Sequence, residues 1–246
     1  MNDLVSSIRE RYLQALDKIA SATKRSGRSP EAVKLVVVTK AQPAETVRAA
    51  IEAGAVILGE NYAGEGVTKI QSLQNFSAVE WHMIGHVQSR KAPLVAGNFN
   101  FMHSLDSLKL AKRLDRFCSE AGRVLPVLLE FNVGGEESKG GWEATDELRW
   151  RELTGEISEI LTLPNLRLRG LMVMPPLGAT PEFSRPFFQK ARRLQEFLSA
   201  QLPGTDFAEL SMGTSSDYEA AVEEGATFVR VGAAIVGARH YNTEAG

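Results

Sequence analysis

Short apolar runs alternate along the chain with longer stretches in which apolar residues recur every three or four positions. The short runs are rich in β-branched residues and are typical of buried strands, whereas the longer stretches are typical of amphipathic helices. Eight strands are expected, at 35–39, 55–58, 80–84, 99–103, 124–131, 169–172, 207–210 and 228–231. Helices are expected between most of them, at 43–53, 63–73, 89–95, 107–121, 146–161, 184–202 and 217–224.

This alternation of strands and helices predicts the architecture. A helix in almost every gap indicates parallel βαβ units, and eight strands favour a closed (β/α)8 TIM barrel over an open sheet. The 246 residues match the size of one such barrel, so we expect a single domain over residues 1–246. Residues 1–30 add an N-terminal helix that flanks the barrel, with apolar positions at Leu4, Ile8, Leu13, Leu16 and Ile19.

Composition and charge exclude several classes of function. The net charge of −2 provides no basic field for nucleic acid. No uncharged apolar segment approaches the roughly 18 residues of a membrane span, and the N-terminus does not read as a signal peptide. The single cysteine, Cys118, cannot form an internal disulfide, which fits a reducing compartment, and its place in an expected helix favours a core residue over a nucleophile. We therefore expect a cytoplasmic protein that does not enter membranes.

Lys40 follows the first expected strand, and Pro43 lies just behind it. In a parallel barrel the functional residues collect at the carboxyl ends of the strands. A lysine there, partly desolvated by the core, suits a Schiff base or a general base. A lysine whose aliphatic stem covers the strand end is the other interpretation, and spacing alone leaves both open.

Two loops near the end of the chain indicate a phosphate site. Residues 211–217 follow the seventh expected strand, and residues 232–235 follow the eighth. The loops after these two strands form the recurrent phosphate site of TIM barrels, where small residues let backbone N–H groups approach the anion. A cluster of Ser and Asp can also be a simple helix N-cap, so each loop by itself is weak evidence.

Arg230 lies within the last expected strand and needs an acceptor if it points into the barrel. Alternation leaves an inward and an outward orientation equally open. A lysine after the first strand, a phosphate site after the last two and an inward arginine together describe pyridoxal 5'-phosphate (PLP). Its aldehyde suits the lysine, its phosphate suits the two loops, and its pyridine nitrogen suits the arginine.

The motifs of this chain resemble, in order, those of the pyridoxal phosphate homeostasis proteins of the YggS/PROSC type. The resemblance implies the fold-type III PLP-binding barrel of the alanine racemase N-terminal domain. It extends from about residue 35 to residue 237. It rests on the motifs at 38–40, 59–62, 80–89, 103–104, 135–141, 170–172, 211–213 and 230–232.

The resemblance also implies roles for individual residues. Lys40 would hold the cofactor as a Schiff base, and Arg230 would hydrogen-bond the pyridine nitrogen. Asn61 and Met174 would lie near the ring or its lysine. The phosphate would be held by hydroxyl and backbone N–H groups of four residues, namely Ser211, Gly213, Gly232 and Ala233.

Two functions from different classes follow. Arginine only donates hydrogen bonds and so keeps the pyridine nitrogen unprotonated, which makes the ring a poorer electron sink. The resemblance implies a non-catalytic protein that buffers or delivers PLP and maintains PLP and amino-acid homeostasis. The alternative is a PLP-dependent racemase acting on a small amino acid. It would need a second base from Tyr62, His86 or His103, because the tyrosine-bearing second domain of the racemases is not expected here.

We assign no catalytic residue and no metal site, because the four histidines show no metal-ligand spacing. The expected partners are PLP and, transiently, PLP-dependent apoenzymes. We expect a monomer. The segment 134–142 is either a mobile lid or a simple exposed loop.

Overall fold

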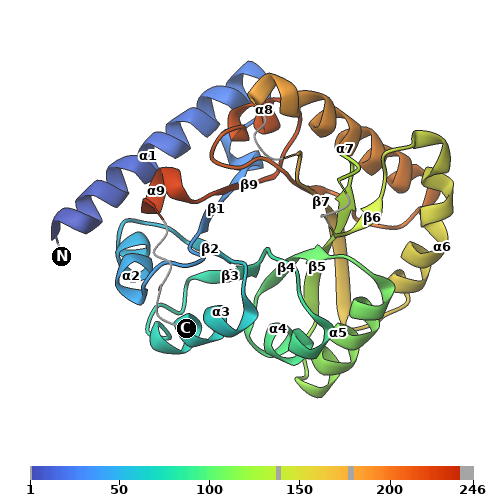
Figure 1. The fold of residues 1–246 in the computed structure, drawn as a ribbon, viewed down its shortest axis with the longest axis horizontal. Coiled ribbons are helices and arrows are strands. Elements are labelled where there is room, and N and C mark those ends of the chain that lie inside the picture. The colour runs from blue at the N-terminus through green and yellow to red at the C-terminus, as the bar shows by residue number, and fades with distance from the viewer. Residues whose placement is uncertain (1, 137–139, 177–179, 239–246) are drawn as a thin grey trace.

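A computed structural model describes residues 2–136, 140–176 and 180–238 of the chain. Its sheet runs in the order β4-β3-β2-β1-β9-β8-β7-β5-β6, and an additional pairing of β4 with β5 closes eight of these strands into a barrel. Every pairing is parallel. The helices form an outer ring around the barrel (Figure 1). The expected (β/α)8 barrel is confirmed.

The eight barrel strands coincide with the eight expected ones to within a few residues. They are β1 (Lys34–Val38), β2 (Ile57–Glu60), β3 (Glu80–Met83), β4 (Phe101–Leu105), β5 (Leu125–Asn132), β7 (Leu166–Val173), β8 (Glu209–Ser211) and β9 (Phe228–Val231). One short strand, β6 (Trp142–Glu143), was not expected from the sequence. It pairs with the end of β5 beyond the barrel wall, and two residues are too few to show an alternating pattern.

The helices also follow the expected order. They are α1 (Asn2–Arg25), α2 (Ala44–Glu52), α3 (Ala63–Ser72), α4 (Ala92–Asn98), α5 (Leu108–Glu120), α6 (Trp150–Leu161), α7 (Pro181–Gln201), α8 (Tyr218–Glu223) and α9 (Ala233–Val236). Short 3-10 turns, Pro30–Ala32, Ser89–Lys91 and Glu147–Arg149, precede β1, α4 and α6. Side chains cap some of the helices, and the Ser107 hydroxyl, for example, accepts the Leu110 N–H at the start of α5.

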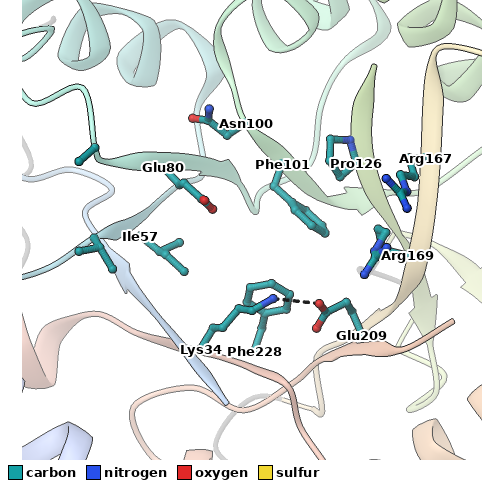
Figure 2. Close-up of a pocket in the computed structure, with 12 residues that line it drawn as sticks. Lys34, Ile57, Glu80, Asn100, Phe101, Pro126, Arg167, Arg169, Glu209 and Phe228 are labelled. Carbon is teal, nitrogen blue, oxygen red and sulfur yellow. Dashed lines mark hydrogen bonds and ion pairs between the residues drawn. The ribbon is translucent and has the colours of Figure 1, made fainter. Parts of the chain in front are cut away.

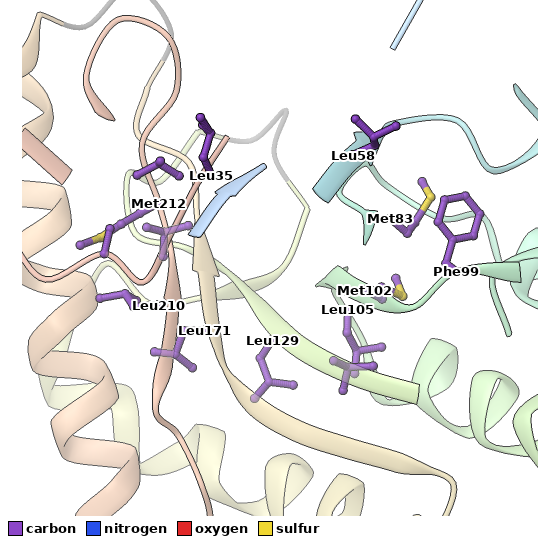
Figure 3. Close-up of a cluster of buried hydrophobic side chains, with 14 of the residues drawn as sticks. Leu35, Leu58, Met83, Phe99, Met102, Leu105, Leu129, Leu171, Leu210 and Met212 are labelled. Carbon is purple, nitrogen blue, oxygen red and sulfur yellow. The ribbon is translucent and has the colours of Figure 1, made fainter. Parts of the chain in front are cut away.

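Alternating strand residues build two separate apolar layers. One set points outward and packs under the helices; it includes Leu35, Leu58, Met83, Met102, Leu129, Leu171 and Leu210 (Figure 3). The other set points inward, where Val36, Ile57 and Phe228 form a distinct cluster with Phe101 against it. Because successive side chains of a strand face opposite sides, residues two apart share one layer. Arg230 therefore shares the inward face of Phe228, and His82 shares the inward face of Glu80.

The N-terminal helix α1 flanks the barrel, as expected. It buries one apolar face, which includes Ile8, Ala15 and Ile19, and it packs against α2, α8 and α9. Arg28, just after the helix, donates to the carbonyl groups of Val222 and Ala226 at 2.9 Å each. The helix thereby supports the elements that follow the last two barrel strands.

Candidate functional site

Lys40 lies two residues beyond the end of β1, at the carboxyl-terminal mouth of the barrel, and is half-buried. The next residue, Ala41, adopts a left-handed backbone conformation with a φ of 55°, which is unusual for a residue with a side chain. The N–H of Ala41 donates to Glu65 Oε1 at 2.8 Å. The backbone around Lys40 is therefore held in one specific and strained conformation, as is common at functional sites.

A buried ion pair contacts the turn that contains Thr39 and Lys40. Lys69 Nζ lies 2.8 Å from Glu60 Oε1 and donates to the carbonyl oxygen of Thr39 at 2.6 Å. The hydroxyl of Thr39 donates to the same Glu60 oxygen at 2.6 Å. Burial raises the pKa of Glu60, and the charge of Lys69 and the two hydrogen bonds oppose that shift. Sequence reasoning did not single out Lys69, because an isolated lysine on a helix gives no signal of a buried partner.

Arg230 on β9 points into the barrel. The sequence left an inward and an outward orientation open, and the inward one is observed. It is 4% exposed, and its guanidinium donates to Ser211 Oγ at 2.5 Å and to the carbonyl oxygen of Val173 at 3.0 Å. Burial lowers the pKa of Arg230 to about 10, against the opposing charges of Asp217 and Glu130. The group still carries its proton at neutral pH and can only donate hydrogen bonds.

The loops after β8 and β9 meet at the same mouth. The N–H of Gly232 donates to Ser215 Oγ at 3.2 Å, which joins the two loops. Gly213 has a φ of 88°, and a Cβ atom there would lie 2.5 Å from the Cβ of Ala221. Only glycine fits that position. Ser215 and Ala233 are exposed at the rim.

The two serines of the first loop have different surroundings. The hydroxyl of Ser211 is fully buried inside the barrel, between Arg230 and His103, whereas the hydroxyl of Ser215 faces the rim. The role of Ser211 toward the phosphate stays a prediction. Ser215, which was not selected from the sequence, offers an accessible hydroxyl, and its only signal was membership of a serine-rich loop.

Asn61 and Met174 lie beyond the ends of β2 and β7, at the same mouth as Lys40. The Oδ1 atom of Asn61 is buried and has no hydrogen-bond partner among the described residues. An unpartnered buried acceptor is rare and fits a ligand that donates to it. Met174 is half-buried. The structure thus brings the eight predicted site residues to one end of the barrel or into the interior beneath it.

The residues at this mouth fit PLP chemically. A half-buried lysine amine suits its aldehyde, a donor-only guanidinium suits its pyridine nitrogen, and the glycine and serine residues of the two loops suit its phosphate. Of the three candidates for a second base, His103 is fully buried and bonded within the barrel. Tyr62 is 58% exposed, and His86 Nδ1 lies 2.8 Å from Asp106. Of the three, His103 is therefore the one enclosed in the barrel wall.

The opposite, amino-terminal mouth holds a cavity of about 570 Å³ (Figure 2). Its lysine, Lys34, lies 3.0 Å from Glu209 and 4.7 Å from the centre of the Phe228 ring. Functional sites of this fold lie at the other mouth, and the small-residue loops that could hold a phosphate lie there as well. The carboxyl-terminal mouth is therefore the candidate cofactor site.

Other features of the described residues limit the possible chemistry. Cys118 is buried, and burial raises the pKa of its thiol to about 11, so it is a core residue as expected. Among residues 2–136, 140–176 and 180–238, no cluster of three or more metal-binding side chains occurs. Within the same ranges, every helix is too short or too polar to span a bilayer. Residues 137–139 of the possible lid lie outside the described residues.

Sequence comparisons match nearly the whole chain. A family model described as the alanine racemase N-terminal domain matches residues 13–240. A protein of Vibrio alginolyticus named pyridoxal phosphate homeostasis protein is 40% identical over 241 residues, which are 97% of this chain and 100% of the relative. A protein of the same name from Escherichia coli is 38% identical over 98% of this chain and 99% of the relative.

Comparison with solved structures agrees with the sequence matches. PipY of Synechococcus elongatus, solved with PLP bound, has a TM-score of 0.78 and 36% identity, covering 94% of this chain and 100% of PipY. Its structure without PLP gives a TM-score of 0.79 over 90% and 99% of the two chains, at 37% identity. The alanine racemase of Clostridium difficile matches with a TM-score of 0.65 at 20% identity, and 61% of its chain is covered, which shows a common fold.

Proposed function

The chain belongs to the pyridoxal phosphate homeostasis proteins, a group with the alanine racemase N-terminal domain, and we propose that it binds PLP at the carboxyl-terminal mouth of its barrel. Its function is to buffer or deliver PLP and so to maintain PLP and amino-acid homeostasis. The observation that carries the proposal is the convergence of Lys40, Arg230 and the Ser215–Gly232 contact at one mouth of the barrel. A PLP-bound relative of the same fold supports it.

Different residues of the mouth would bind different parts of the cofactor. The amine of Lys40 would bind the aldehyde covalently and reversibly, since such bonds exchange with water and amines. Gly213, Gly232, Ala233 and the hydroxyls of the first loop would hold the phosphate. When bound, PLP supplies a reactive aldehyde on an electron-withdrawing ring. The donor-only Arg230 would keep the pyridine nitrogen unprotonated and so weaken carbanion chemistry.

This electronic setting favours a carrier over a racemase, although Tyr62 and His86 are placed near the mouth. A carrier must protect its cofactor and still be able to transfer it. Partial burial of Lys40 would protect the cofactor, and the open mouth would allow its transfer. We propose that the protein acts as a cytoplasmic monomer that contacts PLP-dependent apoenzymes transiently. Exchange of the α-proton of alanine in heavy water, with turnover, would instead support the racemase.

The decisive experiment is the visible absorption spectrum of the purified protein before and after borohydride treatment. We expect a yellow protein whose band disappears on reduction, with the added mass on the peptide that contains Lys40. Lys40→Ala should lose the band, whereas Lys34→Ala should keep it. Lys34 is the matched control because it begins β1, the strand that Lys40 follows, and lies at the other mouth.

Two outcomes would contradict the proposal. A protein that stays colourless with added PLP does not bind the aldehyde, and a band that survives Lys40→Ala belongs to another lysine. We further expect Lys40→Ala to bind PLP non-covalently, because the phosphate contacts are separate from the amine. Complete loss of binding in this variant would show that the lysine, and not the phosphate loops, sets retention.

A further inference from the structure

A continuous series of hydrogen bonds runs through the interior of the barrel, from Arg230 to Glu80. Arg230 Nη1 lies 2.5 Å from Ser211 Oγ, which lies 2.8 Å from His103 Nδ1. His103 Nε2 lies 2.9 Å from His82 Nδ1, and His82 Nε2 lies 3.2 Å from Glu80 Oε2. The series joins β9, β8, β4 and β3, and we call these five residues the interior relay.

The middle of the interior relay is sealed from solvent. Ser211, His103 and His82 are 0% exposed, and the rings of Phe101 and Phe228 pack against both imidazoles with centroids 5.0–5.7 Å apart. Buried polar groups that lack a hydrogen bond are costly. Each buried member of the relay must therefore form hydrogen bonds with its two neighbours in the series.

With both imidazoles neutral, the charged ends determine where every proton lies. A guanidinium only donates and a carboxylate only accepts. Ser211 therefore accepts from Arg230, and His82 donates from Nε2 to Glu80. A neutral imidazole has one donor and one acceptor, so Nδ1 of His82 accepts from Nε2 of His103, and Nδ1 of His103 accepts from the hydroxyl of Ser211.

This proton order is self-consistent and uses every ring nitrogen once. Both histidines are neutral and carry their proton on Nε2. The neutrality that this order needs has a physical cause, because burial lowers the pKa of His82 and of His103. All four hydrogen bonds of the relay thus point the same way, from the cation to the anion.

Glu80 stands at the amino-terminal mouth, opposite the cofactor site. Its side chain is 59% exposed and borders the cavity that also contains Arg167 and Arg169 (Figure 2). A solvent-accessible carboxylate at one end of the barrel is thereby connected to the arginine at the other end. The role of such a carboxylate resembles that of the acid that fixes a histidine tautomer in catalytic triads.

We propose that Glu80, His82 and His103 are positioning residues, which fix the proton on Ser211 and thereby hold the Arg230 guanidinium in one orientation toward the pyridine nitrogen of the bound cofactor. The part that concerns the cofactor rests on the proposed function. The proton order inside the barrel does not, because it follows from contacts within the protein. The two parts can therefore fail separately.

The proton order is tested first, on the protein without cofactor. Long-range 1H–15N spectra of the imidazoles distinguish the two tautomers from the charged ring, and only four histidines need assignment. At pH 7 we expect His82 and His103 to be neutral, with Nε2 protonated and Nδ1 accepting. A proton on Nδ1 of either ring, or a charged ring, would overturn the relay whatever the cofactor does.

The positioning role is tested by variants at the exposed end. Glu80→Gln keeps an acceptor for His82, whereas Glu80→Leu removes it, and Arg167→Gln changes a charge in the same cavity without touching the relay. We expect Glu80→Leu to disturb the His82 tautomer and to weaken PLP binding about threefold to tenfold. Glu80→Gln and Arg167→Gln should stay within twofold of the parent protein.

The outcomes separate the two proposals. Unchanged tautomers and unchanged PLP affinity in folded Glu80→Leu would show that Glu80 only covers the mouth, and would refute the positioning role. An equal loss in Glu80→Leu and Arg167→Gln would assign the effect to the charge of the cavity and refute it as well. If the parent protein binds no PLP, the proposed function fails, and the spectra alone decide the proton order.

Discussion

At the scale of single residues, the two imidazoles inside the barrel make stability depend on pH. The pKa of His82 and that of His103 are both lowered in the folded protein, so the unfolded chain binds more protons as the pH falls below about 6.5. The stabilising contribution is complete above pH 6.5 and is lost below it. The free energy of unfolding should fall by about 1.4 kcal/mol per pH unit for each imidazole that stays neutral.

The pH dependence is measured by urea unfolding between pH 7.5 and 5.5, a window that avoids most carboxylate titration. His103→Asn removes one of the two groups and should reduce the slope by about half, even if the variant is less stable at every pH. A flat profile between pH 6.5 and 5.5 in the parent protein would mean that the buried rings take up protons as readily as the unfolded chain does.

The residue scale also shows how much of the site the sequence could predict. Lys40 was predictable because a strand end places it without any knowledge of distant contacts, whereas alternation left both orientations of Arg230 open. The partners of Ser211 were not, because its hydroxyl meets His103, which is 108 positions away in the sequence. Ser215 was missed for another reason, since three serines in one loop have the same chemistry and only the backbone decides which one faces the rim.

At the scale of elements, the buried pair of Glu60 and Lys69 connects α3 to the turn that carries Lys40. Replacing Lys69 with Met leaves the Glu60 carboxylate buried without its cation and also removes the donor to the Thr39 carbonyl. Loss of one partner of a buried pair costs about 3–5 kcal/mol. We expect Lys69→Met to lower the free energy of unfolding in urea by that amount and to weaken PLP binding.

A double variant distinguishes the pair from simple loss of packing. In Glu60→Gln/Lys69→Met the buried carboxylate is gone, and Glu65, which also pairs with Lys69, is partly exposed to solvent, so part of the stability should return. If the double variant is as unstable as the sum of the two single variants, the two residues act independently and the pair does not organise the turn.

Within β7, Gly170 sets how closely β8 can approach. Its φ is 151°, and a Cβ atom there would lie 1.8 Å from the carbonyl oxygen of Glu209, so the backbones must move apart in Gly170→Ala. We expect a loss of at least about 2 kcal/mol in the free energy of unfolding. Gly155→Ala on α6 is the matched control, because no atom lies near and a helical alanine should stabilise by about 0.5–1 kcal/mol. Thermal unfolding of both variants tests this, and equal stability would contradict the close approach.

The elements also explain why the fold was predictable and its details were not. Eight apolar runs separated by amphipathic stretches have few alternatives to a parallel barrel, so the order of elements followed from periodicity. Strand ends shifted by a few residues, as for β4, because pairing with neighbours decides where a ladder stops. The two-residue strand β6 depends only on its contact with β5, which no local pattern encodes.

At the scale of the whole molecule, the barrel has two mouths of different chemistry, joined by the interior relay. One mouth combines Lys40 with loops of small residues, and the other combines exposed cations and carboxylates around a cavity. The apolar layer of Val36, Ile57 and Phe228 lies between the cavity and the candidate cofactor site, and the interior relay passes beside it.

The N-terminal helix α1 connects the surface of the molecule to the loops that are proposed to hold the phosphate. Arg11 Nε donates to the carbonyl oxygen of Ile235 at 2.6 Å and so holds α9, the short helix that directly follows Gly232. Arg11→Gln removes this charged donor. We expect it to loosen α9 and to weaken PLP binding about threefold to tenfold, without changing the colour of the bound cofactor. Arg9→Gln is the matched control, because Arg9 lies two residues away on α1 and bonds the Glu52 carbonyl of α2 instead.

Titration of both variants with PLP, followed by absorbance, decides whether α1 acts on the site or only covers the barrel. A lower affinity in Arg11→Gln alone means that the helix helps to set the geometry of the phosphate loops, so retention of the cofactor depends on an element outside the (β/α)8 core. Equal affinity in both variants, with equal losses of stability, would mean that α1 contributes burial and nothing more. The first result would also explain why a protein that binds one small cofactor keeps a 24-residue helix before its first strand.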